Sequence, residues 1–189
     1  MATEIELKAH VEDREALKSA AASFARFSGS FEKEDVYWYG PGMIPKSGLR
    51  IRQETDTDPQ GAVARSLAVT YKIKETRNGI EVNDEREFTV SDIGNFEELL
   101  RRLGLAPGTR KRKRGWSWDY EGIAIELAEI SGLGWFAELE ILADNDRPDT
   151  VAHARSRLLT LLRRLGIGED KIETRYYTEM LRSLQEKTP

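Results

Sequence analysis

Residues 3–11 read TEIELKAHV, and charged and apolar side chains alternate along this stretch. Alternation with period two predicts a β-strand whose two faces differ in character. Glu4, Glu6 and Lys8 share one face, and the isoleucine and leucine between them lie on the other. The question this strand raises is whether its charged face meets bulk water or lines an interior.

Further strands with the same alternation are expected along most of the chain. They are predicted over 31–39, 49–54, 65–74, 80–90, 109–120, 123–130 and 135–143. Turn residues at 40–48, a polar loop at 55–62 and the Asn78-Gly79 pair separate some of them. Short connections favour antiparallel pairing between neighbouring strands.

Helices are predicted over 12–27, 91–104, 147–166 and 176–186, from apolar stripes at helical spacing and from capping signals such as Pro148. Strands interrupted by a few helices indicate the α+β class. Nothing in the composition splits the chain, so we expect a single domain over residues 1–189.

The charges on these strands are sorted by sign onto single faces. The same-face acids are Glu4, Glu6, Glu85, Glu87, Glu126, Glu138 and Glu140, and the same-face bases are Lys8, Arg50, Arg52, Lys72, Lys74, Arg112 and Arg114. An open antiparallel sheet with one face in water would explain why these strands carry charged residues. It explains poorly why residues of one sign share a face. About eight strands suffice to close a barrel. We therefore favour an eight-stranded antiparallel β tunnel with a charged interior and helices packed outside.

The basic strand at 109–120 leaves its register open. The stretch RKRKR at 110–114 places Arg112 and Arg114 on one face, and Lys111 and Lys113 on the other. A slip of one residue exchanges the two faces. We expect the arginine pair to face the interior, with the lysine pair as the rival.

Composition excludes several kinds of site. The 189 residues contain no cysteine and two histidines, which rules out disulfides, thiolate chemistry and His-rich or Cys-based metal sites. A net charge of −4 argues against a general nucleic-acid binder, even though RKRKRGWSW at 110–118 resembles a basic patch with aromatics. No apolar run is long enough for a membrane span or a signal-peptide core, so a cytoplasmic location is expected.

An interior with both signs of charge fits one class of ligand. Ions that are buried without partners cost several kcal/mol each, so such a tunnel needs water or a charged occupant. Polyphosphate oxygens prefer arginine and lysine, and the Mg²⁺ or Mn²⁺ that accompanies them prefers carboxylate oxygens. The ligand indicated is a polyphosphate with a divalent cation.

The chain also resembles a known family. EIELK at 4–8 resembles the N-terminal ExExK signature of the CYTH proteins, or triphosphate tunnel metalloenzymes, and further motifs follow in the family's order. These are DVYWY at 35–39, LRIR at 49–52, VTYKIK at 69–74, EREF at 85–88 and GLGWFAELE at 132–140. TRYYTEML at 174–181 resembles the Arg-x-Tyr ending of the class IV adenylyl cyclase-like branch.

The resemblance implies an eight-stranded antiparallel tunnel and metal-dependent chemistry on a triphosphate. The activity implied first is a class IV adenylyl cyclase-like conversion of ATP to cyclic AMP and pyrophosphate. The alternatives are a triphosphatase acting on thiamine triphosphate or tripolyphosphate, and a non-catalytic polyphosphate-binding module. A homodimer is compatible with all three. One departure is Ala128, where the family often has an aspartate.

Roles follow for the charged residues. The seven acids are expected to hold the metal, and the seven bases together with Arg175 to bind the substrate. Glu6 and Lys8 are also the expected catalytic residues, since a lysine among cations can have a lowered pKa and serve as a base.

Overall fold

The computed structural model describes residues 3–41, 43 and 47–186, and over them eight strands close into one antiparallel barrel. The strands are β1 (Thr3–His10), β2 (Arg26–Tyr39), β3 (Ser47–Thr57), β4 (Val63–Arg77), β5 (Ile80–Thr89), β6 (Ala106–Tyr120), β7 (Ile123–Ile130) and β8 (Gly134–Ala143). Their order around the barrel is β1-β5-β4-β3-β2-β6-β7-β8, and β8 pairs with β1 to complete the closure. The predicted fold class is confirmed.

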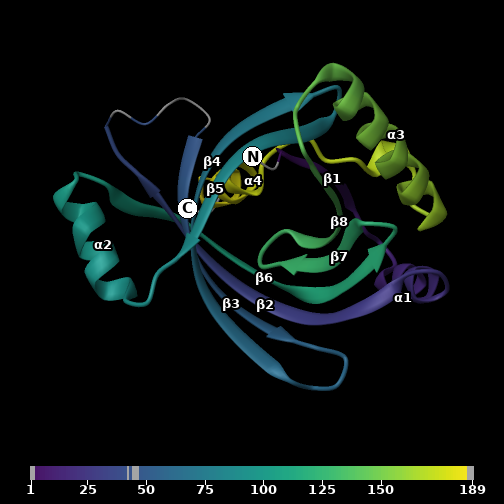
Figure 1. The fold of residues 1–189 in the computed structure, drawn as a ribbon, viewed down its shortest axis with the longest axis horizontal. Helices are drawn as coiled ribbons and strands as arrows, with labels where there is room; N and C mark the ends of the chain where they lie inside the picture. Colours follow the sequence, from purple (N-terminus) through teal and green to yellow (C-terminus); the bar gives the residue numbers. More distant parts are fainter. Residues whose placement is uncertain (1–2, 42, 44–46, 187–189) are drawn as a thin grey trace.

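Four α-helices lie around this barrel (Figure 1). They are α1 (Arg14–Ala22), α2 (Ile93–Arg102), α3 (Pro148–Arg164) and α4 (Tyr177–Gln185), with a short 3-10 turn, η1 (Glu169–Lys171), between the last two. In Figure 1, α1 and α3 lie to the right of the barrel and α2 to the left. None of the helices in the described part of the chain is long and apolar enough to cross a membrane.

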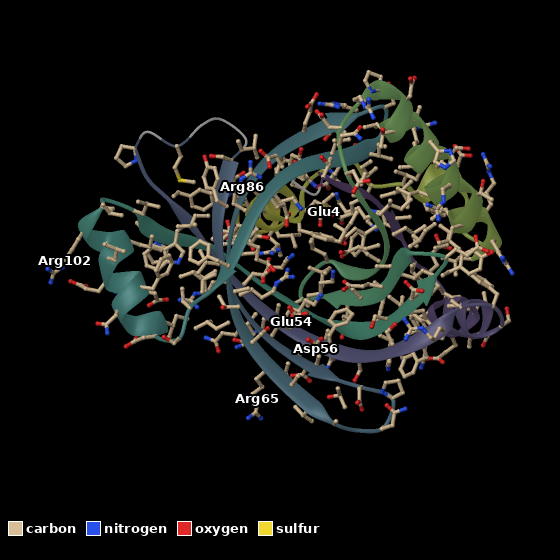
Figure 2. The ribbon with its side chains drawn as sticks, viewed as in Figure 1. Glu4, Glu54, Asp56, Arg65, Arg86 and Arg102 are labelled. Atoms are coloured by element: carbon tan, nitrogen blue, oxygen red, sulfur yellow. The ribbon has the colours of Figure 1, made fainter. Side chains whose placement is uncertain are left out.

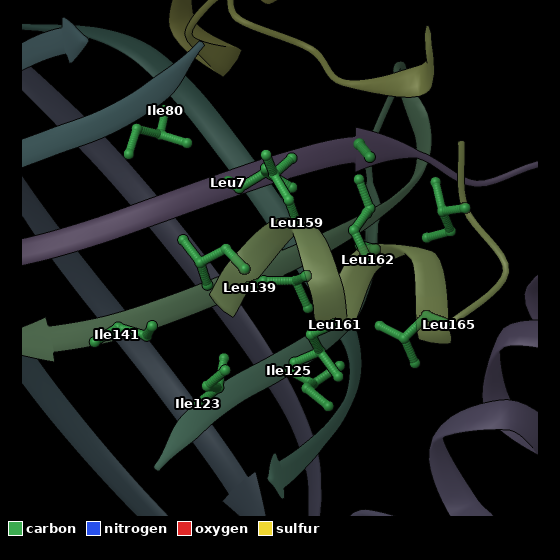
Figure 3. Close-up of a cluster of buried hydrophobic side chains, with 14 of the residues drawn as sticks. Leu7, Ile80, Ile123, Ile125, Leu139, Ile141, Leu159, Leu161, Leu162 and Leu165 are labelled. Atoms are coloured by element: carbon green, nitrogen blue, oxygen red, sulfur yellow. The ribbon is translucent and has the colours of Figure 1, made fainter. Parts of the chain in front are cut away.

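The largest apolar core lies outside the barrel wall, beneath α3 (Figure 3). Leu158 and Leu162 of α3 are fully buried together with Leu7 of β1, Leu139 of β8 and Ile125 of β7. These strand residues have the parity opposite to that of the charged positions. The barrel thus buries its apolar face outward against helices and turns its charged face inward, as the alternation predicts.

A second core lies under α2, on the other side of the barrel. Leu100 of α2 packs with Trp38, Ile51 and Val69, which come from β2, β3 and β4. On the α1 side, Trp116 of β6 stacks on Trp135 of β8, with ring centroids 5.7 Å apart. Most of the apolar supply is thus divided among outer layers. A third buried cluster differs, because its Ala128 and Phe136 share the lumenal faces of Glu126 and Glu138 and pack with Tyr177 of α4.

The helix predicted over 12–27 is too long at its C-terminal end. It begins after Asp13, whose side chain accepts from the backbone N–H of Glu15 and Ala16, and ends at Ala22. Residues 26–27 already belong to β2, because Phe27 pairs with Trp118 across the β2–β6 ladder and their rings lie 5.6 Å apart. Tertiary pairing of an aromatic residue here outweighs the helical pattern.

Other boundaries differ slightly from the prediction. Residues 55–57 of the predicted polar loop continue β3, so the turn is confined to residues 58–62. In the predicted turn at 40–48, positions 42 and 44–46 lie outside the described residues.

Gly115 tests how tightly the barrel wall is packed. A Cβ placed there would lie 1.9 Å from the carbonyl oxygen of Leu127 on the neighbouring strand, whereas a Cβ at Gly48 would meet nothing closer than 3.9 Å. We expect Gly115→Ala to lower the free energy of unfolding by about 1–3 kcal/mol through overpacking. Thermal and urea unfolding of both variants measure this, with Gly48→Ala as the control at or above wild-type stability. Wild-type stability of Gly115→Ala would show that the two strands separate freely.

Candidate active site

The barrel encloses a charged cavity of about 570 Å³. Eight acidic and eight basic residues line it. The acids are Glu4, Glu6, Glu81, Glu85, Glu87, Glu126, Glu138 and Glu140, and the bases are Lys33, Arg50, Arg52, Lys72, Lys74, Arg86, Lys111 and Lys113. Figure 2 labels Glu4 over the barrel interior, and Arg102 at the far side of α2. The sign-sorted faces of the strands therefore meet in one lumen.

The acidic side of the lumen is built by β1, β5 and β8. Lys72 of β4 bridges Glu4 and Glu85, with Nζ 2.5 Å from the Glu85 carboxylate. Burial opposes ionisation of Glu4, but the charge and hydrogen bond of Lys72, with a hydrogen bond from Asn83, lower its pKa to about 2. Glu4 is thus held as an anion whose cation is a lysine of β4, two strands along the wall.

The pKa values of Glu6 and Glu140 are shifted in the opposite direction from that of Glu4, because most of their charged neighbours are acidic. Burial and the charges of Glu81, Glu138 and Glu4 raise the pKa of Glu6 to about 8. Burial and the charges of Glu4 and Glu6 raise that of Glu140 to about 9. The two residues are direct partners in the β1–β8 ladder. A site with excess buried carboxylate would gain most from a further positive charge.

The donor set fits a hard divalent cation. Carboxylate oxygens are the ligands such ions prefer, and Glu4, Glu6 and Glu140 occupy adjacent lumenal positions on two paired strands. Among the described residues no three carboxylate or imidazole groups converge as a ready-made ligand set, and the present partner of Glu4 is Lys72. Binding a cation would therefore exchange a lysine partner of Glu4 for a metal partner.

The basic side of the lumen is built by β2, β3, β4 and β6. Asp35 is fully buried and accepts two hydrogen bonds from Arg52, at 2.7 and 3.1 Å, while the Lys111 ammonium lies 3.1 Å away. Arg50 donates to Thr70 at 2.8 Å, and Glu87 lies 3.5 Å away with a half-exposed side chain. Asp35 thus orients both Arg52 and Lys111. One carboxylate cannot neutralise two cations, so net positive charge remains on this side of the cavity.

Lys74 has a different environment from the other lysines. Its ammonium lies 4.5 Å from the ring centroid of Tyr176 and 5.7 Å from that of Tyr37. Burial, with the charges of Lys72 and Lys111, lowers its pKa below the usual value. Lys74 is therefore the lumenal amine that is most readily neutral.

Lys8 has the opposite character. It forms a buried ion pair with Glu81, and although burial alone would lower its pKa, the charges of Glu81 and Glu6 raise it. The prediction that Lys8 serves as a base is not supported by this environment, since its proton is held by two carboxylates. Its charge instead ties β1 to β5.

A second ion-pair cluster extends deeper into the lumen. Lys113 lies 2.5 Å from both Glu126 and Glu138, and Lys33 lies 2.8 Å from Glu126. The Tyr177 hydroxyl of α4 donates to Glu138 at 2.8 Å, so α4 reaches the lumen. Glu126 and Glu138 are thereby neutralised within the protein, unlike Glu6 and Glu140.

The register expected for β6 is wrong. Lys111 and Lys113 face the lumen, whereas Arg112 and Arg114 lie outside, with side chains 72% and 70% exposed, in ion pairs with Glu34 and Glu129. Their parity is that of Trp116 and Trp118, which pack on the outer apolar face. Continuing that parity backwards along the strand identifies the lysines as the lumenal pair.

Arg175, which was expected to bind the substrate, lies away from the cavity. It binds Glu173 through both guanidinium and backbone, with Nη2 2.6 Å from Oε2, and its side chain is 63% exposed. It does not line the cavity, although the next two residues, Tyr176 and Tyr177, do. The ion pair with Glu173, two positions earlier, holds the guanidinium of Arg175 outside the lumen.

Several lumenal residues were not predicted as site residues. Lys33, Asp35, Glu81 and Asn83 all lie on the lumenal face of strands that were predicted over 31–39 and 80–90, so applying the face rule to every polar residue of these strands would have found them. Ala128, at the family's aspartate position, is fully buried in an apolar cluster with Phe136 and contributes no carboxylate.

Comparisons with known proteins agree with this arrangement. The family model described as CYTH domain matches residues 2–177. A relative from Methanocaldococcus jannaschii, named "Putative adenylate cyclase", is 26% identical over 94% of this chain and 97% of its own. The solved structure of the PH1819 protein from Pyrococcus horikoshii is 28% identical, with a TM-score of 0.83 over 96% of this chain and 99% of that one.

A further structural neighbour shares the fold at lower identity. It is a Hippeastrum protein described as a "Putative adenylyl cyclase" that "reveals a dominant triphophatase activity", 19% identical, with a TM-score of 0.66 over 97% of this chain and 96% of that one. The family match spans nearly the whole length of the barrel described above. The chain belongs to the CYTH domain family, whose members are adenylyl cyclase-like enzymes or triphosphatases that act on triphosphate compounds and depend on divalent metal ions.

Proposed function

We propose that this protein is a divalent-metal-dependent triphosphatase that hydrolyses a triphosphate compound inside the barrel. The observation that carries the proposal is the composition of the lumen. Its sixteen charged residues match the phosphates and a metal, whereas among the described lining residues Leu142 is the single aliphatic side chain. Such a wall recognises a triphosphate chain far better than it recognises a nucleobase.

The two sides of the lumen would divide the ligand between them. Arg50, Arg52 and Lys111 would bind the phosphate oxygens, and Glu4, Glu6 and Glu140 would hold the divalent cation. When bound, the cation supplies positive charge that neutralises phosphate oxygens and the leaving group. Most of the catalysis in phosphoryl transfer comes from this kind of positioning and charge stabilisation, which requires no protein nucleophile.

The reaction also needs a proton acceptor for the attacking water. In hydrolysis, the water oxygen bonds to the terminal phosphorus, the bridging P–O bond breaks, and the water proton leaves. Lys74 is the residue we assign to accept it, because its lowered pKa makes a neutral amine accessible. The diphosphate leaving oxygen keeps the electron pair of the broken bond and is stabilised by the surrounding arginines.

The second candidate is the adenylyl cyclase reaction, in which the ribose 3′-oxygen of ATP attacks the α-phosphorus and pyrophosphate leaves. It is favoured by the name of the 26% identical relative. The C-terminal Arg-x-Tyr resemblance gives it less support than expected, since Arg175 pairs with Glu173 outside the lumen.

The products decide between these functions. Purified protein would be incubated with Mg²⁺ or Mn²⁺ and, separately, ATP, thiamine triphosphate and tripolyphosphate, while orthophosphate, pyrophosphate and cyclic AMP are each quantified. We expect orthophosphate without cyclic AMP. Cyclic AMP in equal amount to pyrophosphate would establish the cyclase instead, and tight binding without any product would establish a binding module.

Lys74 and Lys8 make a matched pair for the assignment of the base. Arginine keeps the positive charge but is not deprotonated in proteins. We expect Lys74→Arg to lower kcat by about 10²-fold or more and to abolish the rise of rate with pH that deprotonation of Lys74 produces. Lys8→Arg, which preserves the ion pair with Glu81, should keep both the rate and the pH profile. Equal losses in the two variants would contradict the assignment.

The corrected register of β6 can be tested at two adjacent positions. Lys111 faces the lumen and Arg112 faces solvent, so only the former can bind phosphate. We expect Lys111→Gln to raise KM for the triphosphate about tenfold or more, since a charged hydrogen bond is worth about 1.5–3 kcal/mol. Arg112→Gln should leave KM unchanged. A rise in KM seen only in Arg112→Gln would show instead that Arg112, and not Lys111, faces the lumen.

A further inference from the structure

Asn83 of β5 holds a buried polar atom that the site described above does not use. The residue is fully buried, and its Nδ2 donates to Glu4 Oε2 at 3.1 Å. Its Oδ1 is buried and has no hydrogen-bond partner among the described residues. An unpaired buried amide oxygen costs about 1–3 kcal/mol, so a partner in the loaded site would recover that energy.

The orientation of this amide is fixed by chemistry. Rotating it by 180° would place Oδ1 against the Glu4 carboxylate, and both groups are acceptors. The amide nitrogen must therefore face Glu4, which leaves the oxygen as the group without a partner.

The surroundings of Asn83 limit what its oxygen can bind. Asn83 pairs with Glu4 on one side and with Lys74 on the other, and it lies between Glu81 and Glu85 on the lumenal face of β5. Lys74 is turned toward the ring of Tyr176 at 4.5 Å, rather than forming a hydrogen bond to the amide. Phosphate oxygens are acceptors, as Oδ1 is, so a phosphate would be repelled. A cation can satisfy the oxygen, whereas a phosphate cannot.

We propose that Asn83 contributes its amide oxygen as a ligand of the divalent cation held by Glu4, Glu6 and Glu140. Side-chain carbonyl oxygens are regular ligands of hard cations. The same residue would then serve twice, since its N–H group orients Glu4 and its oxygen binds the ion. This inference rests on the metal site of the proposed function and adds a neutral ligand from a fourth lumenal position.

The test measures binding of Mn²⁺ alone, without triphosphate, from the electron paramagnetic resonance signal of free Mn²⁺. We expect Asn83→Leu to raise the dissociation constant roughly tenfold or more, because it removes both the oxygen and the donor. Asn83→Asp should bind more tightly than Asn83→Leu at pH 8, because it restores an oxygen ligand although it does not restore the amide donor to Glu4. Thr109→Val is the control, since Thr109 is buried on β6 and its hydroxyl accepts from Arg182 at 3.3 Å.

The variants separate the possible failures. Wild-type affinity in Asn83→Leu would overturn the ligand role. Equal weakening in Asn83→Leu and Asn83→Asp would also overturn it, because the amide would then act only by donating to Glu4. Circular dichroism melting curves confirm folding, and Asn83→Thr replaces the leucine variant if that variant does not fold. Absence of Mn²⁺ binding by the wild type would instead remove the metal site itself, a different result from a defect confined to position 83.

Discussion

The cost of burying charge is the constraint on which this structure depends. A barrel that turns lysine, arginine and glutamate inward takes many ions out of bulk water, and each would cost several kcal/mol without compensation. The structure compensates by placing opposite charges on neighbouring strands of the wall, as where Lys72 bridges Glu4 and Glu85 and Lys113 bridges Glu126 and Glu138. The compensation is uneven, and the proposed site lies where it is least complete. Glu6 and Glu140 have mainly acidic neighbours, while Lys74 lies near Lys72 and Lys111 as well as Glu81.

The unequal pairing also explains how one lumen can exist both with and without its ligand. Buried carboxylates with raised pKa values hold protons when no cation is present, which removes much of their mutual repulsion. On the other wall, Asp35 neutralises part of the charge of Arg52 and Lys111. A triphosphate would add negative charge beside the basic side chains, and its divalent cation would add positive charge beside the acidic ones. The ligand would thus supply the counter-charge that each wall lacks.

The alternation of side chains was enough to predict the barrel, its charged interior and most of the acidic residues. It worked where an apolar residue marks the outer face, as Ile5 and Leu7 do between Glu4, Glu6 and Lys8. It failed at RKRKR, because five consecutive charges carry no such mark, and the marker lies further along at Trp116 and Trp118. Arg175 was assigned by resemblance alone, and the side-chain geometry that directs it to Glu173 is not encoded in any periodic pattern.

The position of the acidic cluster would link cation binding to the closure of the barrel. β1 and β5 are far apart in sequence and pair only over Thr3–Glu6 and Glu81–Asp84, whereas β1 pairs with β8 over all of Thr3–His10. Polar side chains reinforce this short seam, through the buried Lys8–Glu81 ion pair and the hydrogen bond from Asn83 to Glu4. The same residues border Glu6 and Glu140. A cation bound there would join carboxylates of β1 and β8 beside the seam, so loading the site should also stabilise the barrel at its shortest ladder.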